Sequence, residues 1–387
     1  MKTIYLDNNA TTAISPDVLN EMLPYLKDLY GNPSSGHSFG RNLYYIIEQA
    51  REKVAYLIGA EPEEIIFTSC GTESDNTAIA SAIQSDENKR HIITTQVEHP
   101  AILNYVKHLE RKGYTSTYLP VDGAGKLNID AFMNTLDDDT AIVSIMVANN
   151  ETGVIFPIAE IGAMCRERGI LFHTDAVQAA GKVPMDVQKL GVDMLSISGH
   201  KLHAPKGIGV LYVRKGSKYF PYFIGGHQEY GHRAGTENLT SIVALGKACE
   251  LALENIAYEH TSIAGLRDLL ELNLKNKCSD IFINGYDSER LSNTSNISFS
   301  HVDSEALLHR LDTYGICASA GSACSSGSSE PSHVLRAMGV PDDAIHGSIR
   351  FSLSRYTTVE EVNTVIEILP GIINKLRAGS LVGSVQS

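Results

Sequence analysis

Short runs of apolar residues separated by amphipathic stretches are the feature that most constrains the fold of this chain. The runs are mostly uninterrupted rather than alternating with polar residues, which is typical of β-strands covered on both faces. Between several of them lie helical patterns, for example at residues 102–112 and 158–168. Repeated strand–helix–strand order predicts a largely parallel sheet flanked by helices. We expect seven strands, at residues 65–68, 91–97, 115–119, 141–147, 170–174, 194–197 and 209–213.

The pattern changes after about residue 256. A terminal helix is predicted to be kinked or broken at Pro370 and to be followed by a frayed tail over residues 378–387. We therefore expect a large domain over residues 15–256 and a smaller α+β domain made of residues 1–14 and 257–387. The predicted elements of the small domain are helices at 266–274, 305–311 and 359–376 and strands at 296–299 and 349–353.

Composition narrows the class of protein. The chain has 387 residues, 43% of them hydrophobic, and a formal net charge of −13. The acidic balance and the lack of a Lys/Arg-rich run argue against a nucleic-acid partner. No apolar run approaches the ~20 residues that a membrane-spanning helix needs. The start MKTIYLD meets a charge, at Asp7, too early to be a signal peptide. We expect a cytoplasmic protein without a membrane partner.

The six cysteines are scattered and form no C-x-x-C pair, which favours reduced thiols over a disulfide framework or a metal site. Cys324 stands out because residues 319–331 around it are almost all Ser, Gly and Ala. Such small side chains cannot anchor a loop by burial, so we expect a mobile loop with an accessible thiol. Cys324 is then a candidate nucleophile that travels to a substrate. The alternative is an ordinary flexible linker with an incidental cysteine.

Two charged residues follow predicted strands. Lys201 comes just after the strand at 194–197, where desolvation can turn a lysine into a nucleophilic amine. Asp175 ends another apolar strand, and a buried carboxylate needs a partner such as a pyridinium nitrogen. A solvated loop lysine and a structural hydrogen-bond cap are the alternative interpretations.

Gly71 and Thr72 stand where a strand passes into a helix. Free backbone N–H groups and the helix dipole favour a phosphate at such a place, although strand–turn–helix glycines are common. A nucleophilic lysine, a pyridinium partner and a phosphate cradle together predict pyridoxal 5′-phosphate (PLP) as the cofactor.

The sequence resembles the cysteine desulfurases of the NifS/IscS type, and most closely their NifS-like branch. The resemblance runs nearly from end to end and is carried by long, ordered motifs. These motifs are YLDNNATT at 5–12, NNETG at 149–153, SHVLRAM at 332–338 and IRFSLSRYT at 349–357. The resemblance implies fold type I of the PLP enzymes (aspartate-aminotransferase-like), with a mainly parallel seven-stranded sheet in the large domain and a smaller α+β domain.

The resemblance also implies the residues that bind the cofactor. Lys201 matches the lysine that binds PLP covalently, His99 the histidine that stacks on its ring and can shuttle protons, and Asp175 the partner of the pyridinium nitrogen. The remaining matches contact the oxygen substituent of the ring or the phosphate. They are Gln178 and Asn150 near the phenolic oxygen, Gly71, Thr72, Ser198 and His200 at the phosphate, and Thr236 at the phosphate of the neighbouring subunit of an obligate homodimer.

The implied reaction removes sulfur from L-cysteine to give L-alanine and a persulfide on Cys324. Arg350, with Asn150, matches the residues that hold the substrate, and the planar fork of Arg350 suits a carboxylate. The implied sulfur acceptor is an iron–sulfur scaffold protein of the NifU/IscU type. Other interpretations are a selenocysteine lyase, a lyase or aminotransferase for another amino acid, and a sulfur carrier that has lost PLP chemistry. A plain aminotransferase needs no thiol such as Cys324, and a carrier has no use for Lys201 and Asp175.

Overall fold

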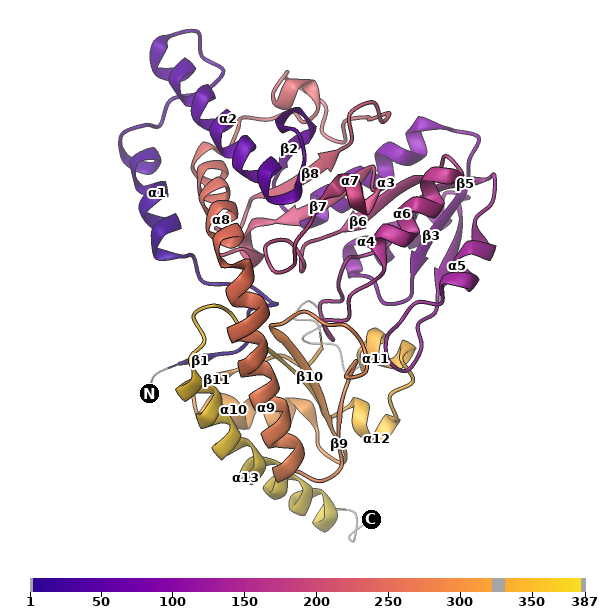
Figure 1. Cartoon of the computed structure of the whole chain (residues 1–387), viewed down its shortest axis with the longest axis vertical. Coiled ribbons are helices and arrows are strands. Elements are labelled where there is room, and N and C mark those ends of the chain that lie inside the picture. The colour runs from indigo at the N-terminus through magenta and orange to yellow at the C-terminus, as the bar shows by residue number, and fades with distance from the viewer. Residues whose placement is uncertain (1–2, 322–330, 384–387) are drawn as a thin grey trace.

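A seven-stranded sheet forms the centre of the larger part of the molecule (Figure 1). The computed structural model describes residues 3–321 and 331–383. Strand β8 runs antiparallel to both of its neighbours, and the other neighbouring pairs are parallel, which confirms the predicted mainly parallel sheet. In spatial order the strands are β2 (Ile65–Thr68), β8 (Gly209–Val213), β7 (Met194–Ser198), β6 (Leu171–Asp175), β5 (Thr140–Ser144), β3 (His91–Thr95) and β4 (Thr115–Leu119).

Successive residues of each central strand pack into different hydrophobic cores. On β3, for example, Ile92 packs with helices α3 (Gly71–Ser85) and α4 (Pro100–Glu110), whereas Ile93 faces the opposite core. The central strands are therefore buried on both faces, as their uninterrupted apolar runs predict. The other helices of this part are α1 (Pro16–Lys27), α2 (Ser38–Ile58), α5 (Ile129–Thr135), α6 (Ile158–Glu167), α7 (Val187–Leu190) and α8 (Leu239–Tyr258), with short 3₁₀ turns η1 (Pro62–Glu64), η2 (Gly199–Lys201) and η3 (Glu229–Gly231).

The hydrophobic residues on the two faces of the large sheet are taken together as the first core, and a second core lies in the part of the chain drawn lower in Figure 1. Helices α9 (Ala264–Lys277), α10 (Ser304–Thr313) and α13 (Val359–Gly383) pack there against a three-stranded sheet, and Ile4 and Leu6 join them. The predicted boundaries at residues 14 and 256 stay a prediction. The remaining elements are β1 (Ile4–Tyr5), paired with β11 (Ile316–Cys317), the sheet strands β9 (Ile281–Ile283), β10 (Thr294–Phe299) and β12 (Ser348–Ser352), and helices α11 (His333–Ala337) and α12 (Asp342–Ile345).

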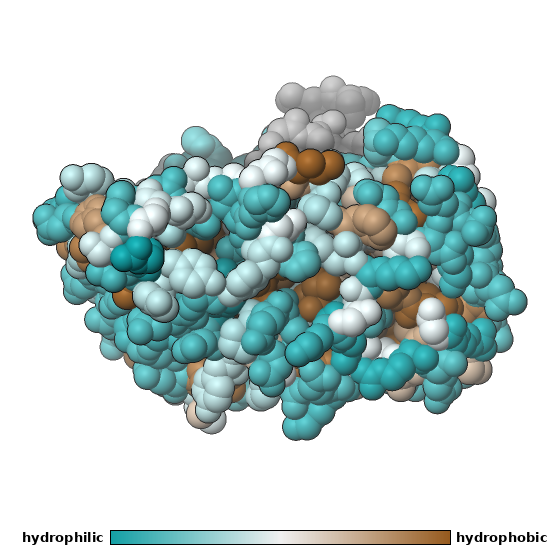
Figure 2. All heavy atoms as spheres, turned by 90° about the horizontal axis from the view of Figure 1, so that it is seen from above, coloured by the Kyte–Doolittle hydropathy of each residue, from teal (hydrophilic) through white to brown (hydrophobic). Residues whose placement is uncertain are grey.

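One long helical segment joins the two cores. Helix α8 passes into a π-helical turn, η4 (Glu259–Ile263), and continues as α9 without a break. Figure 1 shows this segment running from the upper part of the molecule into the lower part. Seen from above, the surface is mainly hydrophilic, with hydrophobic side chains in separate groups (Figure 2).

The structure corrects the sequence predictions at two strand ends and in the last helix. The predicted strands to residues 97 and 147 were too long, because β3 ends at Thr95 and β5 at Ser144, although Val147 still donates from its N–H to the carbonyl of Asp175 at 2.8 Å. The alternative of a break at Pro370 was wrong, because α13 continues through it to Gly383, while the alternative of a kink stays a prediction. The tail predicted from residue 378 is helical as far as Gly383, and residues 384–387 lie outside the described residues. Leu369 and Ile373 are buried in the second core on either side of Pro370, and this packing outweighs the hydrogen bond that proline cannot make.

Replacing Ile373 tests whether the helix beyond Pro370 supports the second core. Ile373→Ala is expected to lower the free energy of unfolding by about 2–5 kcal/mol, since it removes a fully buried branched side chain. Urea denaturation measures this loss. The control is Leu272→Ala on α9, where the leucine is 61% exposed and we expect a change within ~0.5 kcal/mol. Equal effects of the two variants would contradict the packing.

Candidate active site

A pocket of about 180 Å³ lies at the carboxyl ends of the parallel strands, where α3 also begins. Binding sites of open α/β sheets form at this edge because side chains at the ends of several strands converge there. Ten residues that the sequence singles out line this one pocket: Gly71, Thr72, His99, Asn150, Asp175, Gln178, Ser198, His200, Lys201 and Arg350.

The N-terminal segment holds the side chain of Lys201 just beyond the carboxyl end of β7. Its Nζ donates hydrogen bonds to the backbone carbonyls of Asn9 and of Ala10, the latter at 2.8 Å. The turn η2 that carries the lysine is tight, because a Cβ on Gly199 would come within 2.7 Å of the side chain of Ile208. The backbone N–H of Thr12 also donates to the carbonyl of His200 at 2.9 Å, so this segment is fixed to the lysine turn at several points.

His99 caps the N-terminus of helix α4 and is neutral at physiological pH. Its Nδ1 accepts a hydrogen bond from the N–H of Ala101 at 3.1 Å, and Pro100 occupies the first helical position. Burial lowers the pKa of His99 to about 4, and the positive charge of Lys201 adds to the effect. Because Nδ1 accepts, the proton of the neutral ring is on Nε2.

Asp175 ends β6 and is one of three buried carboxyl groups near the pocket. Its Oδ1 accepts from the N–H of Val177 at 2.8 Å. Burial raises the pKa of Asp175 to about 6, and it also raises the pKa of Asp75, which lines the pocket and is further affected by Asp175. Burial raises the pKa of Glu98, whose Oε1 accepts from Thr95 and Met146, to about 8. A cationic ligand atom would therefore be stabilised here by Asp175.

The start of α3 has the features of an anion cradle. Cys70 precedes the helix without a side-chain cap, which leaves the first N–H groups of a 15-residue helix directed toward the pocket. A Cβ on Gly71 would come within 2.8 Å of Val177 and 3.4 Å of Ser198, so only glycine fits beside the cavity. The Ser198 hydroxyl is buried and has no hydrogen-bond partner within the described part of the chain. These groups could bind a phosphate.

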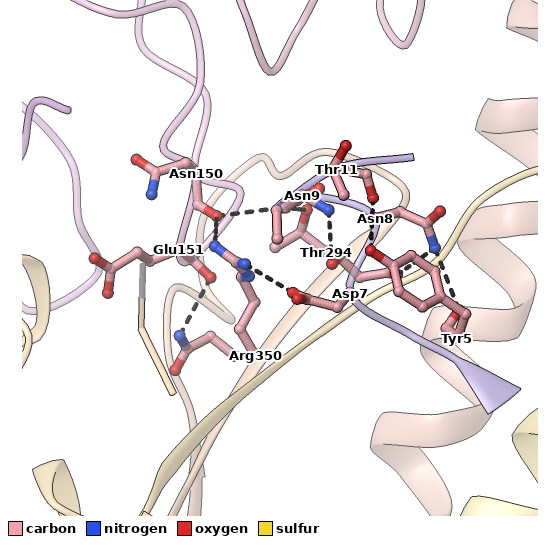
Figure 3. A network of polar contacts seen from close by, with 12 residues as sticks. Tyr5, Asp7, Asn8, Asn9, Thr11, Asn150, Glu151, Thr294 and Arg350 are labelled. Carbon is pink, nitrogen blue, oxygen red and sulfur yellow. Dashed lines mark hydrogen bonds and ion pairs between the residues drawn. The ribbon is translucent and has the colours of Figure 1, made fainter. Parts of the chain in front are cut away.

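Arg350, on β12 of the second core, lines the same pocket, and Figure 3 shows its contacts with Asn150 and Asp7. Its guanidinium is fully buried, donates to the carbonyl of Asn150 at 3.0 Å and pairs with Asp7 at 2.9 Å. Its Nε has no hydrogen-bond partner among residues 3–321 and 331–383. An arginine held in this way can bind a carboxylate that enters the cavity.

Several residues of the site were missed by sequence reasoning. Asn9 is the most important, because its carbonyl accepts from Lys201 and Gln178 while its side chain donates to Thr294 at 2.8 Å (Figure 3). Asp7 and Asp75 were missed as well. The YLDNNATT motif contains both Asp7 and Asn9, but nothing in it shows that they meet residues far along the chain.

Two of the predicted site residues are not among the residues that line the pocket. Thr236 is exposed on the surface, outside the lining of the pocket. Cys324 lies outside the described residues. The chain on either side is anchored beside the pocket: Ser319 and Arg350 exchange backbone hydrogen bonds of 3.3 and 2.7 Å, and the Ser332 hydroxyl donates to Glu151 at 2.6 Å.

Neither a metal site nor a membrane span emerges from the described parts of the chain. Among residues 3–321 and 331–383, no cluster of three His, Cys, Asp or Glu side chains could hold a metal ion. No helix in those two ranges is both long enough and apolar enough to cross a membrane.

Comparisons with known proteins give a consistent result. The family model of class-V aminotransferases matches residues 4–365. The cysteine desulfurase of Trichormus azollae is 57% identical, over 98% of this chain and 94% of its own length. The cysteine desulfurase NifS of Azotobacter vinelandii is 51% identical, over 97% of this chain and 94% of its own length. A solved structure of a NifS-like protein has a TM-score of 0.91 at 39% identity, and the match covers 97% of this chain and all of that one. The chain therefore belongs to the cysteine desulfurases of the NifS-like type, within the class-V aminotransferase family.

Proposed function

We propose that this chain is a PLP-dependent enzyme that takes sulfur from L-cysteine, releasing L-alanine and leaving a persulfide on Cys324. The observation that carries the proposal is the convergence of ten predicted residues, from both hydrophobic cores, on a single pocket. The family to which the chain belongs supports the same reaction.

The residues present fit the cofactor. The unpartnered hydroxyl of Ser198, the start of α3 at Gly71 and Thr72, and His200 would hold the phosphate. Asp175 would hold the ring nitrogen, with His99 against the ring, and Gln178 and Asn150 would contact the phenolic oxygen. Lys201 would bind the aldehyde carbon. The chemistry that PLP supplies when bound is an electron sink for the bonds at the substrate Cα.

The protein's own groups bind and orient the substrate. Arg350 would bind the cysteine carboxylate, with Asp7 and the carbonyl of Asn150 holding the guanidinium in place. The Lys201 amine would carry a proton from the substrate Cα. His99 keeps its proton on Nε2 and would act as a neutral donor rather than as a cation, because burial disfavours its charged form.

Cys324 is proposed to enter the pocket from its anchored neighbours. It is three residues beyond Gly321, a span of at most about 10 Å in an extended chain, and Gly321 lies against the carboxylate of Glu151. The Cys324 thiolate would attack the substrate sulfur, so that an S–S bond forms while the carbon–sulfur bond breaks. The carbon keeps the electron pair of the broken bond and takes up a proton, which gives alanine without any external oxidant or reductant.

We further propose a homodimer in which Thr236 contacts the phosphate of the partner's site. Exposed apolar side chains lie beside it: Ile224 is 91% exposed, and the carbonyl of Phe223 accepts from the N–H of Ala234. A group of this kind on a single chain is typical of an interface. An iron–sulfur scaffold protein of the NifU/IscU type as sulfur acceptor, and a cytoplasmic location, are proposed on the family resemblance. The five described cysteines are all free thiols, which agrees with a reducing compartment.

Replacing Cys324 tests the proposed function directly. With PLP, L-cysteine and a reductant, the unmodified protein is expected to release alanine and sulfide in equal amounts. Cys324→Ala should keep the bound cofactor colour and lose more than about 100-fold in both products, because the nucleophile is absent. The control is Cys317→Ala on β11, which should retain activity. Alanine release by Cys324→Ala at the normal rate would contradict the proposal.

Arg350→Lys tests carboxylate binding. Lysine keeps the charge but loses the planar fork, so we expect KM for L-cysteine to rise about 10- to 100-fold, the equivalent of one charge-assisted hydrogen bond. Steady-state kinetics measure this change, and circular dichroism confirms that the variant is folded. Arg111→Lys, at an exposed position on the far end of α4, is the control. An unchanged KM would assign the carboxylate to another residue.

His99→Gln tests the buried neutral histidine through stability. The pKa of His99 is about 4 when folded, against 6.5 for an ordinary histidine, so the unfolded chain binds a proton first as the pH falls. The contribution of neutral His99 to the free energy of unfolding is therefore fully present above about pH 6.5 and is lost as the pH falls toward 4.

Urea unfolding of the cofactor-free protein at pH 7 and pH 5 measures this effect. The unmodified protein should lose on the order of 1–2 kcal/mol more between these two pH values than His99→Gln does. His309→Gln, at an exposed position on α10, should behave like the unmodified protein. Identical losses in all three proteins would show that His99 is not held neutral by burial.

A further inference from the structure

Lys182 is a buried cation that lies behind the pocket and contacts one of its residues. It follows β6 by seven residues, and its side chain is largely inaccessible. Its Nζ donates to the backbone carbonyl of Gln178 at 2.9 Å and to the side-chain Oε1 of the same residue at 3.3 Å. The Nε2 of Gln178 donates in turn to the carbonyl of Asn9 at 3.0 Å.

These contacts fix the orientation of the Gln178 amide. A carboxamide has one oxygen and one NH₂ group on opposite sides, so a cation at Oε1 keeps the NH₂ group on the side of Asn9 and the pocket. The turn that carries Lys182 cannot move away easily. Gly181 has a positive φ of 71°, and a Cβ there would come within 2.6 Å of Leu202 and 2.7 Å of Ala252 on α8.

The counter-charge for Lys182 comes from the segment between the two cores. Glu259, the first residue of η4, is buried, and its Oε2 has no hydrogen-bond partner in the described ranges. Lys182, Glu259 and Arg355 line one cavity of about 20 Å³, which Lys201 also borders. Such a cavity has room for about one water molecule that could bridge two charged groups. Burial lowers the pKa of Lys182 to about 8, and Glu259 opposes this shift.

We propose that Lys182 is a positioning residue that holds Gln178 with its NH₂ group directed to the pocket, and that Glu259 provides its counter-charge from the π-helical turn. The orientation of a pocket residue then depends on the segment that joins the two cores. This inference rests on the proposed function in one respect, namely that the side chain of Gln178 contacts bound PLP. A lysine that merely caps the Gln178 carbonyl would stabilise the turn without acting through the Gln178 side chain.

A double-mutant cycle on the PLP-loaded enzyme distinguishes these roles. Lys182→Met and Gln178→Leu are each expected to raise the dissociation constant for PLP about 10-fold, the equivalent of one hydrogen bond to a charged group, and to shift the visible absorption band in the same direction. The double variant should show no more than the Gln178→Leu effect, because both changes remove one interaction. Lys189→Met, at a lysine whose side chain is 83% exposed on α7, is the control and should change neither quantity.

Additive effects in this cycle, or an unmoved absorption band in Lys182→Met, would overturn the positioning role. If Lys182→Met does not fold, Glu259→Gln provides the same test from the other side of the cavity. It should shift the band in the same direction as Gln178→Leu, and an unmoved band in a folded Glu259→Gln protein would likewise overturn the proposal.

Thermal unfolding of the cofactor-free protein tests the charge pair independently of PLP. Glu259→Gln leaves Lys182 without its counter-charge, and we expect its Tm to fall by at least about 2 °C. The Lys182→Met/Glu259→Gln double variant removes both charges and should lose less than the sum of the single losses. Strictly additive losses would contradict the pairing. Because this measurement needs neither PLP nor turnover, it keeps its meaning if the proposed function fails.

Discussion

The backbone carbonyl of Asn9 is the acceptor on which the pocket depends. It receives hydrogen bonds from Lys201, at the end of β7, and from Gln178, after β6. The side chain of the same residue bonds to Thr294 and Asn293 in the second core. Asn9, a single residue of the N-terminal segment, thus links the ends of two strands of the large sheet to the three-stranded sheet. The pocket lies where these three parts meet, and Lys201 and Arg350 both line it.

The site keeps several ionisable groups in their neutral forms. Burial lowers the pKa of His99 to about 4 and that of His173, next to Asp75, to about 3, while it raises the pKa of Glu98 to about 8. Such groups cost stability, because each ionises more easily in the unfolded chain. In return, the pocket contains few fixed charges that would compete with the charge of a bound molecule, and those that remain, at Arg350, Lys201 and Asp175, lie at defined positions.

The sequence alone allows much of this arrangement to be predicted, for local reasons. Strands buried on both faces have apolar runs that show both their presence and their order, and the residues after those strands lie at one edge of the sheet. Strand ends are less certain, as at β5, because the chain keeps hydrogen bonding to β6 after the regular strand stops. The resemblance to known enzymes, rather than periodicity, identified Gln178 and Arg350.

Contacts between distant parts of the chain could not be predicted in this way. Asn9 and Lys201 are 192 positions apart, and no local pattern links them. The continuation of α13 through Pro370 depends on burial in a core formed by other elements. In the sequence, Lys182 looks like an ordinary turn lysine. Only the structure shows that it shares a cavity with Glu259. The role of Thr236 requires a second subunit, and Cys324 lies outside the described residues, so both assignments stay predictions.

The parallel pairing of β1 with β11 has a consequence for how the protein is made. Ile4 is translated before the strands of the large sheet, yet its partner Ile316 follows about three hundred residues later. Asp7 is likewise translated long before Arg350, the residue with which it pairs. The large sheet can fold while synthesis continues, but the N-terminal segment reaches its final place beside Lys201 only after β11 and β12 have been translated. A nascent chain that ends before β11 would therefore contain a folded sheet and an unfinished pocket, with Lys201 not yet held in its reactive position.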